Sequence, residues 1–356
     1  MNRKQSWFFA SVALAGAISL GPATAPAGST AAAAARGAAN YHFIREIPIG
    51  GEGGWDYLSI DSAARRLYVA HATQVVVVDL DRSAVIGSIP DTPGIHGVAV
   101  APELGRGFTS NGQESRSSVV DLRSLKTLFK VATGAGPDAI LFDPGRQEIY
   151  TFNGRGKSAT VIDARTNQVV ATVILPGKPE FAVADPDASR IYANIEDQSE
   201  VVAIDNMAHR IVATWPTAPG VEPSGLALDA AHHRLFIGCH NELMVMMDSA
   251  TGRVLATVPI GRGVDANAFD PATGLAFASC GDGTVTIARE DAPGHLVVVQ
   301  TLPTEPGART LALDPATHRI YLATAKFGPL PESPAGGRRR PPVVPGTFKV
   351  LVYGTD

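Results

Sequence analysis

Short apolar strands recur along this chain at a nearly constant interval. Each copy begins with a mostly apolar run that ends in aspartate in six of the seven cases. The runs are YLSID to Asp61, GVAVA to Ala101, AILFD to Asp143, FAVAD to Asp185, GLALD to Asp229, ANAFD to Asp270 and TLALD to Asp314. Their ends are spaced by 40, 42, 42, 44, 41 and 44 residues. This period is typical of β-propellers, so we predict an all-β fold with seven four-stranded antiparallel blades.

The pattern within a unit fits one blade. The first strand is apolar at nearly every position, as expected of an innermost strand packed between neighbouring blades. A turn follows in which aspartate accepts backbone hydrogen bonds, as in Asp143-Pro144-Gly145. The second strand is aromatic and β-branched, as in Arg190-Ile191-Tyr192, and an outer strand such as Val169 to Ile174 completes the unit. Aspartate commonly ends the third strand, at Asp79, Asp121, Asp163, Asp205 and Asp248.

The two ends of the chain predict how the ring closes. The seventh unit has a first strand (Thr310 to Asp314), a second (Arg319 to Ala323) and a third (Phe348 to Tyr353), and then the chain ends at Asp356. The strand-like run His42 to Pro48 precedes the first complete blade. We expect this run to supply the missing outer strand, because closure removes exposed sheet edges.

Two stretches of sequence resemble a known family. They are ATVIDARTNQVVATVILPGKPEFAVADP and IYANIEDQSEVVAIDNMAHRIVATWP, and they look like the bacterial YVTN-repeat (YncE-like) β-propellers. The resemblance covers about Tyr41 to Asp356, and the pattern is lost in Gly274 to Arg289 and in blade seven. It implies an exported seven-bladed propeller, usually without an assigned chemistry. Related propellers include lactonase-like enzymes and the haem-carrying or copper-associated propellers of denitrification.

The first residues predict export. Arg3 and Lys4 precede a 13-residue apolar run, Phe8 to Leu20, which is shorter than the ~20 residues that a membrane span needs. Small residues follow up to Ala27. We therefore expect a cleaved signal peptide over 1–27, a flexible alanine-rich leader over 28–40 and one propeller domain over 41–356. The mature protein would be periplasmic or secreted, with no membrane span; an uncleaved anchor is the alternative.

Composition and motifs exclude several classes of function. The formal charge is −4 and the repeats contain no long basic stripe, so no nucleic-acid partner is expected. The chain contains no Gly-x-Ser-x-Gly, His-Glu-x-x-His or Cys-x-x-Cys-His motif, which removes several hydrolases, zinc proteases and c-type cytochromes. An enzyme whose residues come one from each blade stays open. We expect a monomer.

Ionisable residues mark one end of the predicted central channel. Loops rich in glycine and proline lead into the first strands, and the residue five positions before each strand's end should lie at the channel mouth. These residues are Asp56, His96, Asp138, Glu180, Ser224, Asp265 and Arg309. Four carboxylates and one arginine sum to −3 with His96 neutral, a charge that favours cations. Alternatively, these residues only solvate the rim, and Arg309 pairs with its neighbours.

A metal site is a second interpretation of the same face. His71 and His96 belong to adjacent blades and lie near Asp56 and Asp138 in the predicted order, a nitrogen and oxygen set that suits a divalent metal ion. The alternative is that they are ordinary surface histidines. The loops between second and third strands add Asn111, Asn153, Asn194 and His240 to this face. No other cofactor is predicted.

A long insertion interrupts the seventh unit. Residues 326–347 separate its second and third strands, and their prolines and glycines preclude regular structure. Arg338-Arg339-Arg340 could complement the acidic mouth or hold an anionic partner. The alternative is a protease-sensitive surface loop.

The two cysteines, Cys239 and Cys280, occupy equivalent second-strand positions in neighbouring blades. Such positions are expected to lie farther apart than the roughly 4.4–6.8 Å between Cα atoms that a disulfide allows. We therefore expect two buried free thiols, with a disulfide as the alternative.

Two hypotheses of function follow. The first is an exported scaffold that binds a small ligand or a protein at its channel mouth without chemistry. The alternative is a metal-assisted, lactonase-like hydrolase that uses Asp56, His96, Asp138 and Glu180. An electron-transfer domain has less support because no cofactor-ligand motif is present. Fold resemblance alone does not decide between these functions.

Overall fold

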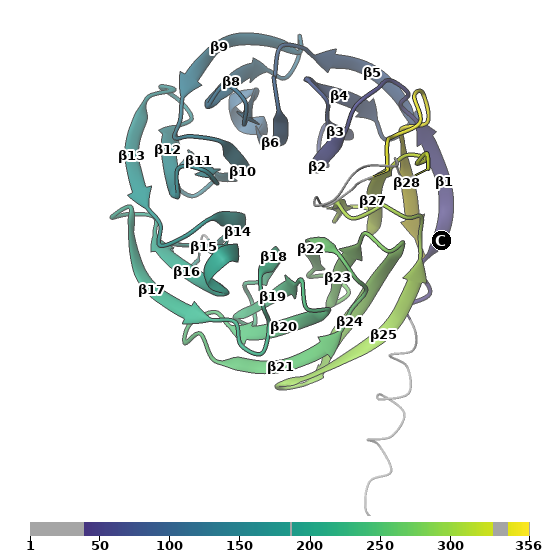
Figure 1. Ribbon diagram of the computed structural model, residues 1–356. Helices are drawn as coiled ribbons and strands as arrows, with labels where there is room; N and C mark the ends of the chain where they lie inside the picture. Colours follow the sequence, from purple (N-terminus) through teal and green to yellow (C-terminus); the bar gives the residue numbers. More distant parts are fainter. Residues whose placement is uncertain (1–38, 186, 330–340, 356) are drawn as a thin grey trace, which may run out of the picture. The chain divides into compact units, whose positions relative to one another are not determined.

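The protein forms a ring of seven four-stranded antiparallel sheets, as Figure 1 shows. The computed structural model describes residues 39–185, 187–329 and 341–355. The predicted signal peptide, most of the leader and Arg338-Arg339-Arg340 lie outside these residues. Within the described part, the predicted number of blades and strands is confirmed.

Blades one to six follow the chain from the innermost to the outermost strand. Blade one contains β2 (Trp55–Asp61), β3 (Arg66–His71), β4 (Gln74–Asp79) and β5 (Ala84–Ile89). Blade two contains β6 (Ile95–Ala101), the short 3-10 helix η1 (Pro102–Leu104), β7 (Arg106–Asn111), β8 (Arg116–Asp121) and β9 (Lys126–Ala132). Blade three contains β10 (Pro137–Asp143), β11 (Glu148–Asn153), β12 (Ser158–Asp163) and β13 (Val169–Ile174).

Blades four to six repeat this order. Blade four contains β14 (Pro179–Asp185), β15 (Arg190–Ile195), the 3-10 helix η2 (Glu196–Gln198), β16 (Glu200–Asp205) and β17 (Arg210–Pro216). Blade five contains β18 (Pro223–Asp229), β19 (Arg234–Cys239), β20 (Leu243–Asp248) and β21 (Val254–Pro259). Blade six contains β22 (Val264–Asp270), β23 (Leu275–Cys280), β24 (Thr284–Ala292) and β25 (His295–Pro303).

The seventh blade joins the two ends of the chain, as predicted. It contains β26 (Leu311–Asp314), β27 (Arg319–Thr324) and β28 (Lys349–Gly354), and its outer strand is β1 (His42–Pro48). β1 pairs antiparallel with β28 from His42 opposite Gly354 to Pro48 opposite Lys349. The Tyr41 ring packs on Phe277 of blade six with 5.2 Å between centroids. The amino-terminal strand therefore closes the ring.

Hydrogen bonds place the two predicted loop types on one face. In six blades the residue after the second strand donates its backbone N–H to a carbonyl 18 residues earlier, in the loop that leads into the first strand. The N···O distances are 2.8–3.2 Å. The donor and acceptor pairs are Ala72 and Gly54, Gly112 and Gly94, Gly154 and Gly136, Glu196 and Lys178, His240 and Glu222, and Gly281 and Gly263. We call this side of the ring the mouth face.

A β-bulge lies near the start of each innermost strand in blades one to six. In blade one, Trp55 pairs with His71 and Leu58 with Val69, so that Asp56 and Tyr57 together face one residue of β3. The same shift occurs in β6, β10, β14, β18 and β22. A bulge leaves one residue without a ladder partner and turns nearby side chains. The bulge therefore falls at the predicted channel-mouth position in all six blades.

The aspartates that end the innermost strands organise the opposite face. Oδ1 of Asp61 accepts the N–H of Ala64 at 2.9 Å, and the equivalent aspartates of blades three to seven accept similar bonds, which confirms the predicted turns. Some also join neighbouring blades, since Asp314 accepts a bond from Arg65 at 2.6 Å. Apolar side chains fill the spaces between blades, as in the cluster that contains Ile47, Leu58 and Val350.

The insertion of blade seven has ordered ends. Phe327 and Val343 form an antiparallel bridge, and the N–H of Gly328 donates to the carbonyl of Pro342 at 2.8 Å. The described part of the insertion, residues 326–329 and 341–347, contains no helix or strand besides this isolated bridge, which agrees with the predicted lack of regular structure. Gly346 also donates to the Gly51 carbonyl at 2.9 Å, which ties the insertion to the mouth face.

Two further features can be compared with the sequence. Cys239 and Cys280 are buried and unpaired, as expected. Among the described residues, no helix has the length and apolar character that would allow it to cross a membrane.

The contribution of the closing strand can be tested with two matched isoleucines on outer strands. Ile47 of β1 is 1% exposed, whereas Ile174 of β13 is 74% exposed. We expect Ile47→Ala to lower the free energy of unfolding by about 2–4 kcal/mol because it leaves a cavity between blades. Ile174→Ala should change it by about 0.5 kcal/mol or less. Denaturant unfolding measures both, and equal effects would contradict a packed closing strand.

Candidate ligand-binding site at the channel mouth

Three of the predicted mouth residues meet in one group. Nδ1 of His96 lies 2.6 Å from Oδ2 of Asp56 and 3.3 Å from Oδ1 of Asp138. These three side chains come from blades two, one and three and are partly buried. One potential ligand atom from each lies within 4.8 Å of the other two. The side chains that the sequence predicts as neighbours are therefore in contact across three blades.

The surroundings of His96 favour its charged form. Burial alone would lower the pKa of the imidazole, but the hydrogen bond with Asp56 and the charges of Asp138, Asp56 and Glu180 outweigh it and raise the pKa to about 9. His96 is therefore a cation at neutral pH, and its Nδ1–H group lies between one carboxylate oxygen of Asp56 and one of Asp138. The sequence-based charge count took His96 as neutral, so it omitted this positive charge.

The position of His96 depends on a glycine of its own blade. A Cβ atom at Gly112 would lie 2.6 Å from Nε2 of His96, closer than real atoms approach. The equivalent glycine of blade three, Gly154, has more room, since its Cβ would lie 3.9 Å from Oδ2 of Asp138 and 3.8 Å from Cε of Lys178. Gly112 thus leaves the space in which the imidazole lies between its carboxylates.

Glu180 belongs to a second charged group. Nζ of Lys178 lies 2.9 Å from Oε2 of Glu180 and also pairs with Glu196. Burial raises the pKa of Glu180 well above its usual range, and the charge of Asp138 adds to this, whereas Lys178 opposes it. Lys178 was not predicted as a mouth residue. Its charge adds a cation that the sequence-based sum of −3 did not include.

Asp265 and Arg309 form a third group. Nε of Arg309 donates to Oδ2 of Asp265 at 2.6 Å, as the pairing alternative for the rim predicted. Burial and the charge of Asp56 raise the pKa of Asp265, while Arg309 opposes the shift. Ser224 is fully buried and its Oγ lies 3.5 Å from Oδ1 of Asp265, a long contact. Ser224 therefore lies beneath the charged groups and not at the opening.

Two aromatic rings cross the channel below these charges. Tyr57 of blade one and Phe181 of blade four meet edge to face with 5.1 Å between centroids. Tyr57 is 8% exposed and packs with core residues of blades three and four, such as Ala139 and Ala182. The rings lie directly after Asp56 and Glu180 in the chain, so the charged mouth has an aromatic floor.

His71 does not join the predicted metal group. Its ring stacks on Phe348 with 4.2 Å between centroids and 24° between planes, and it is 2% exposed. Burial lowers its pKa. The group of potential metal ligands in the described residues contains only Asp56, His96 and Asp138. The physical reason is that the ring of His71 lies against the aromatic side chain of blade seven and beneath Gly51.

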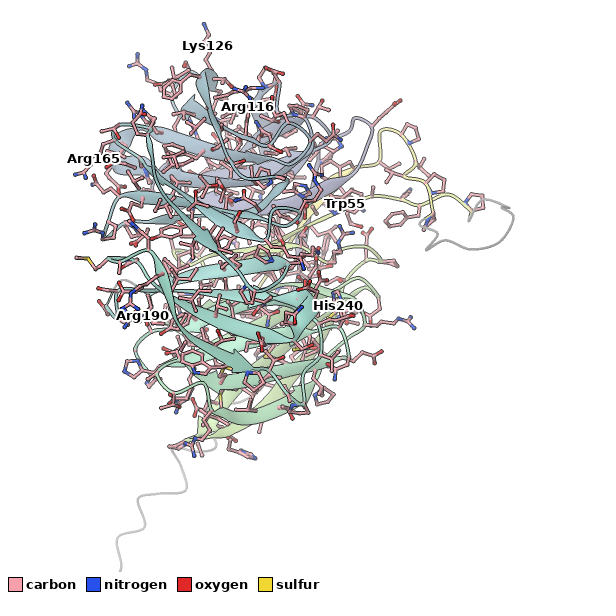
Figure 2. All side chains as sticks on the ribbon, turned by 60° about the vertical axis from the view of Figure 1, so that its left-hand side comes forward. Trp55, Arg116, Lys126, Arg165, Arg190 and His240 are labelled. Atoms are coloured by element: carbon pink, nitrogen blue, oxygen red, sulfur yellow. The ribbon has the colours of Figure 1, made fainter. Side chains whose placement is uncertain are left out.

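The other second-strand ends differ in their exposure. Asn111, Asn153 and Asn194 are fully buried, and Asn194 donates to the Ser224 carbonyl at 2.7 Å, so these amides support the loops and do not face the channel opening. Nδ1 of His240 lies 3.5 Å from Oε2 of Glu222. Figure 2 shows His240 and Trp55 on the side from which the ends of the insertion project, while Arg165 and Arg190 lie toward the opposite side.

The sequence held signals for the residues that the prediction missed. Four positions before the end of each innermost strand the residues are Tyr57, Gly97, Ala139, Phe181, Gly225, Ala266 and Thr310. Two aromatic residues among five small ones mark the floor. Seven positions before the end, glycine occurs in every blade except four and five, which have Lys178 and Glu222. A large or charged residue at a position that is small in most blades therefore indicated the aromatic floor of Tyr57 and Phe181 and the additional cation Lys178.

Comparisons with known proteins support the fold and leave the family open. No protein-family model and no curated protein matches the chain. A chain in a solved structure described as "Crystal Structure of Mitotic Checkpoint Complex" is similar, with a TM-score of 0.70, 15% identity, and coverage of 88% of this chain and 95% of that one. A chain of hydrazine synthase from Kuenenia stuttgartiensis matches with a TM-score of 0.50, 16% identity, and coverage of 67% and 96%. At these identities the likeness shows a β-propeller fold alone.

Proposed function

We propose that this chain is an exported propeller that binds a positively charged ligand at its channel mouth and catalyses no reaction. The observation that carries the proposal is the convergence of partly buried carboxylates above the Tyr57 and Phe181 floor. Among the described residues, the mouth carboxylates pair with His96, Lys178 and Arg309, and His240 lies 3.9 Å from Glu196; these carboxylates are Asp56, Asp138, Glu180, Glu196 and Asp265. When all five carboxyl groups are ionised, they and these three cations sum to −2, which a bound cation would offset. Because the pKa of Glu180 is raised to about 8, this charge is reached only as the pH rises through that value.

The raised pKa values of the carboxyl groups support this proposal. Burial and mutual repulsion raise the pKa of Asp138, Glu180 and Asp265 even though each has a cationic neighbour. A carboxyl whose folded pKa exceeds its unfolded pKa binds its proton more tightly when folded, so its ionisation lowers the stability as pH rises. The free site is therefore destabilised at neutral pH, and a cationic ligand would relieve that repulsion.

Export is a proposal that rests on the amino-terminal sequence. The positively charged start, the apolar run and the small residues before Gly28 form a signal peptide with a cleavage site after Ala27. Amino-terminal sequencing of protein purified from the exported fraction should begin at Gly28. A protein that keeps Met1 or stays in the membrane fraction would contradict export.

Replacing one mouth carboxylate should weaken cation binding without lowering the stability of the free protein. We expect Asp138→Asn to weaken cation binding by about tenfold or more, since hydrogen bonds to charged groups contribute roughly 1.5–3 kcal/mol. At pH 8 the same change should leave the free protein as stable or make it more stable, because it removes the cost of ionising Asp138. Calorimetric titration with simple organic and metal cations measures binding, and thermal unfolding measures stability.

Asp163→Asn is the matched control for this test. Asp163 ends β12 in the same blade, on the opposite face, and accepts turn hydrogen bonds from Arg165 and Thr166. This variant should bind cations normally and should lose a little stability. If Asp138→Asn binds as wild type does, the mouth is not the binding site.

A metal-assisted hydrolase is the second candidate, and the Asp56, His96 and Asp138 group favours it. One nitrogen and two carboxylate oxygens within 4.8 Å of one another form a donor set that divalent transition metals accept. Such an ion would lower the pKa of bound water and polarise a carbonyl oxygen. Nδ1 of His96 would first have to release its proton. Glu180, whose charge acts on His96 and whose own pKa is raised, is a further carboxyl that could exchange a proton.

Metal binding by this group should depend steeply on pH and on Gly112. Because the pKa of His96 is raised to about 9, metal affinity should fall about tenfold for each pH unit below that value. Gly112→Ala should displace the imidazole and abolish metal-dependent thermal stabilisation, whereas Gly154→Ala should retain it. Thermal shifts with Mn²⁺ and Zn²⁺ from pH 6 to pH 9 measure this. Protein without bound metal and without any shift would exclude the metal candidate.

A further inference from the structure

A cavity of about 320 Å³ lies at the seam between blades seven and one. Its wall is formed by the loop that leads from β1 to β2, by the end of β3 and by the outer strands β4 and β5 of blade one. None of the charged mouth residues lines it. Cavities of about 300–1,000 Å³ commonly hold small ligands. We call it the seam cavity, and its wall includes Ile49, Gly51, His71, Gln74, Val76 and Val85.

His71 brings unpaired polar atoms to this wall. The residue is 2% exposed, and neither Nδ1 nor Nε2 has a hydrogen-bond partner among the described residues. Within the described part of the chain, it is the only side chain with two buried polar atoms that both lack a partner. Buried polar groups usually have partners, because an unpaired group loses its hydration without compensation. The ring therefore indicates where the polar group of a ligand would bind.

The edge of the His71 ring that carries both nitrogens points toward Gly51. One face of the ring stacks on Phe348. A Cβ atom at Gly51 would lie 2.9 Å from Cε1, 3.6 Å from Nδ1 and 3.9 Å from Nε2, and Cε1 is the atom between the two nitrogens. Gly51 has a φ of +85°, a conformation that glycine adopts readily. Because Gly51 also lines the seam cavity, a small movement of this residue opens the ring edge to the cavity.

The wall of the seam cavity favours a neutral ligand with apolar surface. Ile49, Val76 and Val85 provide apolar contacts, and Gln74 provides a neutral amide. Apart from His71, the wall contains no ionisable side chain among the described residues. Burial lowers the pKa of His71, so the imidazole is neutral at neutral pH and has one N–H donor and one acceptor nitrogen.

We infer that the seam cavity binds a small neutral alcohol, whose apolar body lies against its valine and isoleucine side chains and whose hydroxyl group hydrogen-bonds to the ring of His71. This site is separate from the channel mouth and does not depend on the proposed cation-binding function. A hydroxyl group both donates and accepts, so it pairs with either ring nitrogen, whichever carries the proton. Its single oxygen atom also requires the smallest movement of Gly51.

Other ligand classes fit the seam cavity less well. An ammonium or carboxylate group would be desolvated against a wall that offers no opposite charge. A hydrocarbon would fill the apolar part of the cavity but would leave both nitrogens of His71 unpaired. A primary amide offers a donor and an acceptor, yet its planar group of three heavy atoms is wider than a hydroxyl group and would displace Gly51 farther.

Titrations of the purified protein followed by NMR test the inference. The probes are benzyl alcohol, toluene, benzamide and benzylammonium, and the signals are the Cε1–H of His71 and the methyl groups of Val76 and Val85. We expect benzyl alcohol to shift these signals and to bind about three- to tenfold more tightly than toluene. If none of the probes shifts them, or if toluene, benzamide or benzylammonium binds there best, the inference is wrong.

The same titrations keep this inference apart from the proposed function. Benzylammonium should leave the His71 signal unchanged and should shift the Cε1–H signal of His96 at the channel mouth. A missing His96 shift would count against cation binding at the mouth and would leave the seam cavity unaffected. A missing His71 shift with benzyl alcohol would overturn the seam site alone.

Two variants provide the second measurement, read from the valine methyl signals. His71→Phe keeps an aromatic ring beside Phe348 and removes both ring nitrogens, so benzyl alcohol affinity should fall about three- to tenfold while toluene affinity stays unchanged. Gly51→Ala should also remove the preference for benzyl alcohol, because its Cβ would press on the ring edge. Gly105→Ala is the matched control, since Gly105 has a φ of +61° and its Cβ would meet nothing within 4 Å. An equal effect of His71→Phe on both probes, or unchanged binding in Gly51→Ala, would overturn the proposed hydrogen bond.

Discussion

The bulge at the start of each innermost strand is the constraint on which the mouth depends. One extra residue in β2, β6, β10, β14, β18 and β22 interrupts the ladder where Asp56, His96, Asp138, Glu180, Ser224 and Asp265 lie. A regular strand packed between neighbouring blades would have to bury these side chains against apolar neighbours, at a high cost in free energy. The bulge frees them from the ladder, and the ring brings them together around one axis.

The same arrangement explains why the mouth is charged but not uniformly acidic. Each of these partly buried carboxylates has a cation beside it, since His96, Lys178 and Arg309 pair with the groups around them. These pairs do not cancel the effects of burial and repulsion, because the pKa values of Asp138, Glu180 and Asp265 stay raised. The fold tolerates this local cost because the apolar clusters between blades stabilise the ring independently. A site of this kind gains stability when a cation binds.

Much of the fold could be predicted from the sequence, and less of the site. The repeat predicted the seven blades, the closing strand His42–Pro48 and the positions of the mouth residues, because strand packing imposes a regular pattern. It could not show that Tyr57 reaches across the axis to Phe181, since that contact joins residues three blades apart. The stacking of His71 on Phe348 was hidden because it joins neighbouring blades whose residues come from opposite ends of the chain. Lys178 was missed because only comparison with the glycines of other blades distinguishes it.

A structure of the mature protein crystallised with n-butylammonium tests the central claim most directly. The account predicts that the ligand nitrogen lies in the mouth above the Tyr57 and Phe181 floor, within about 3.2 Å of at least one oxygen from Asp56 or Asp138. His96 should keep its contact with both aspartates. A ligand found on another face, or a mouth that stays free of ligand while the amine binds in solution, would contradict the account.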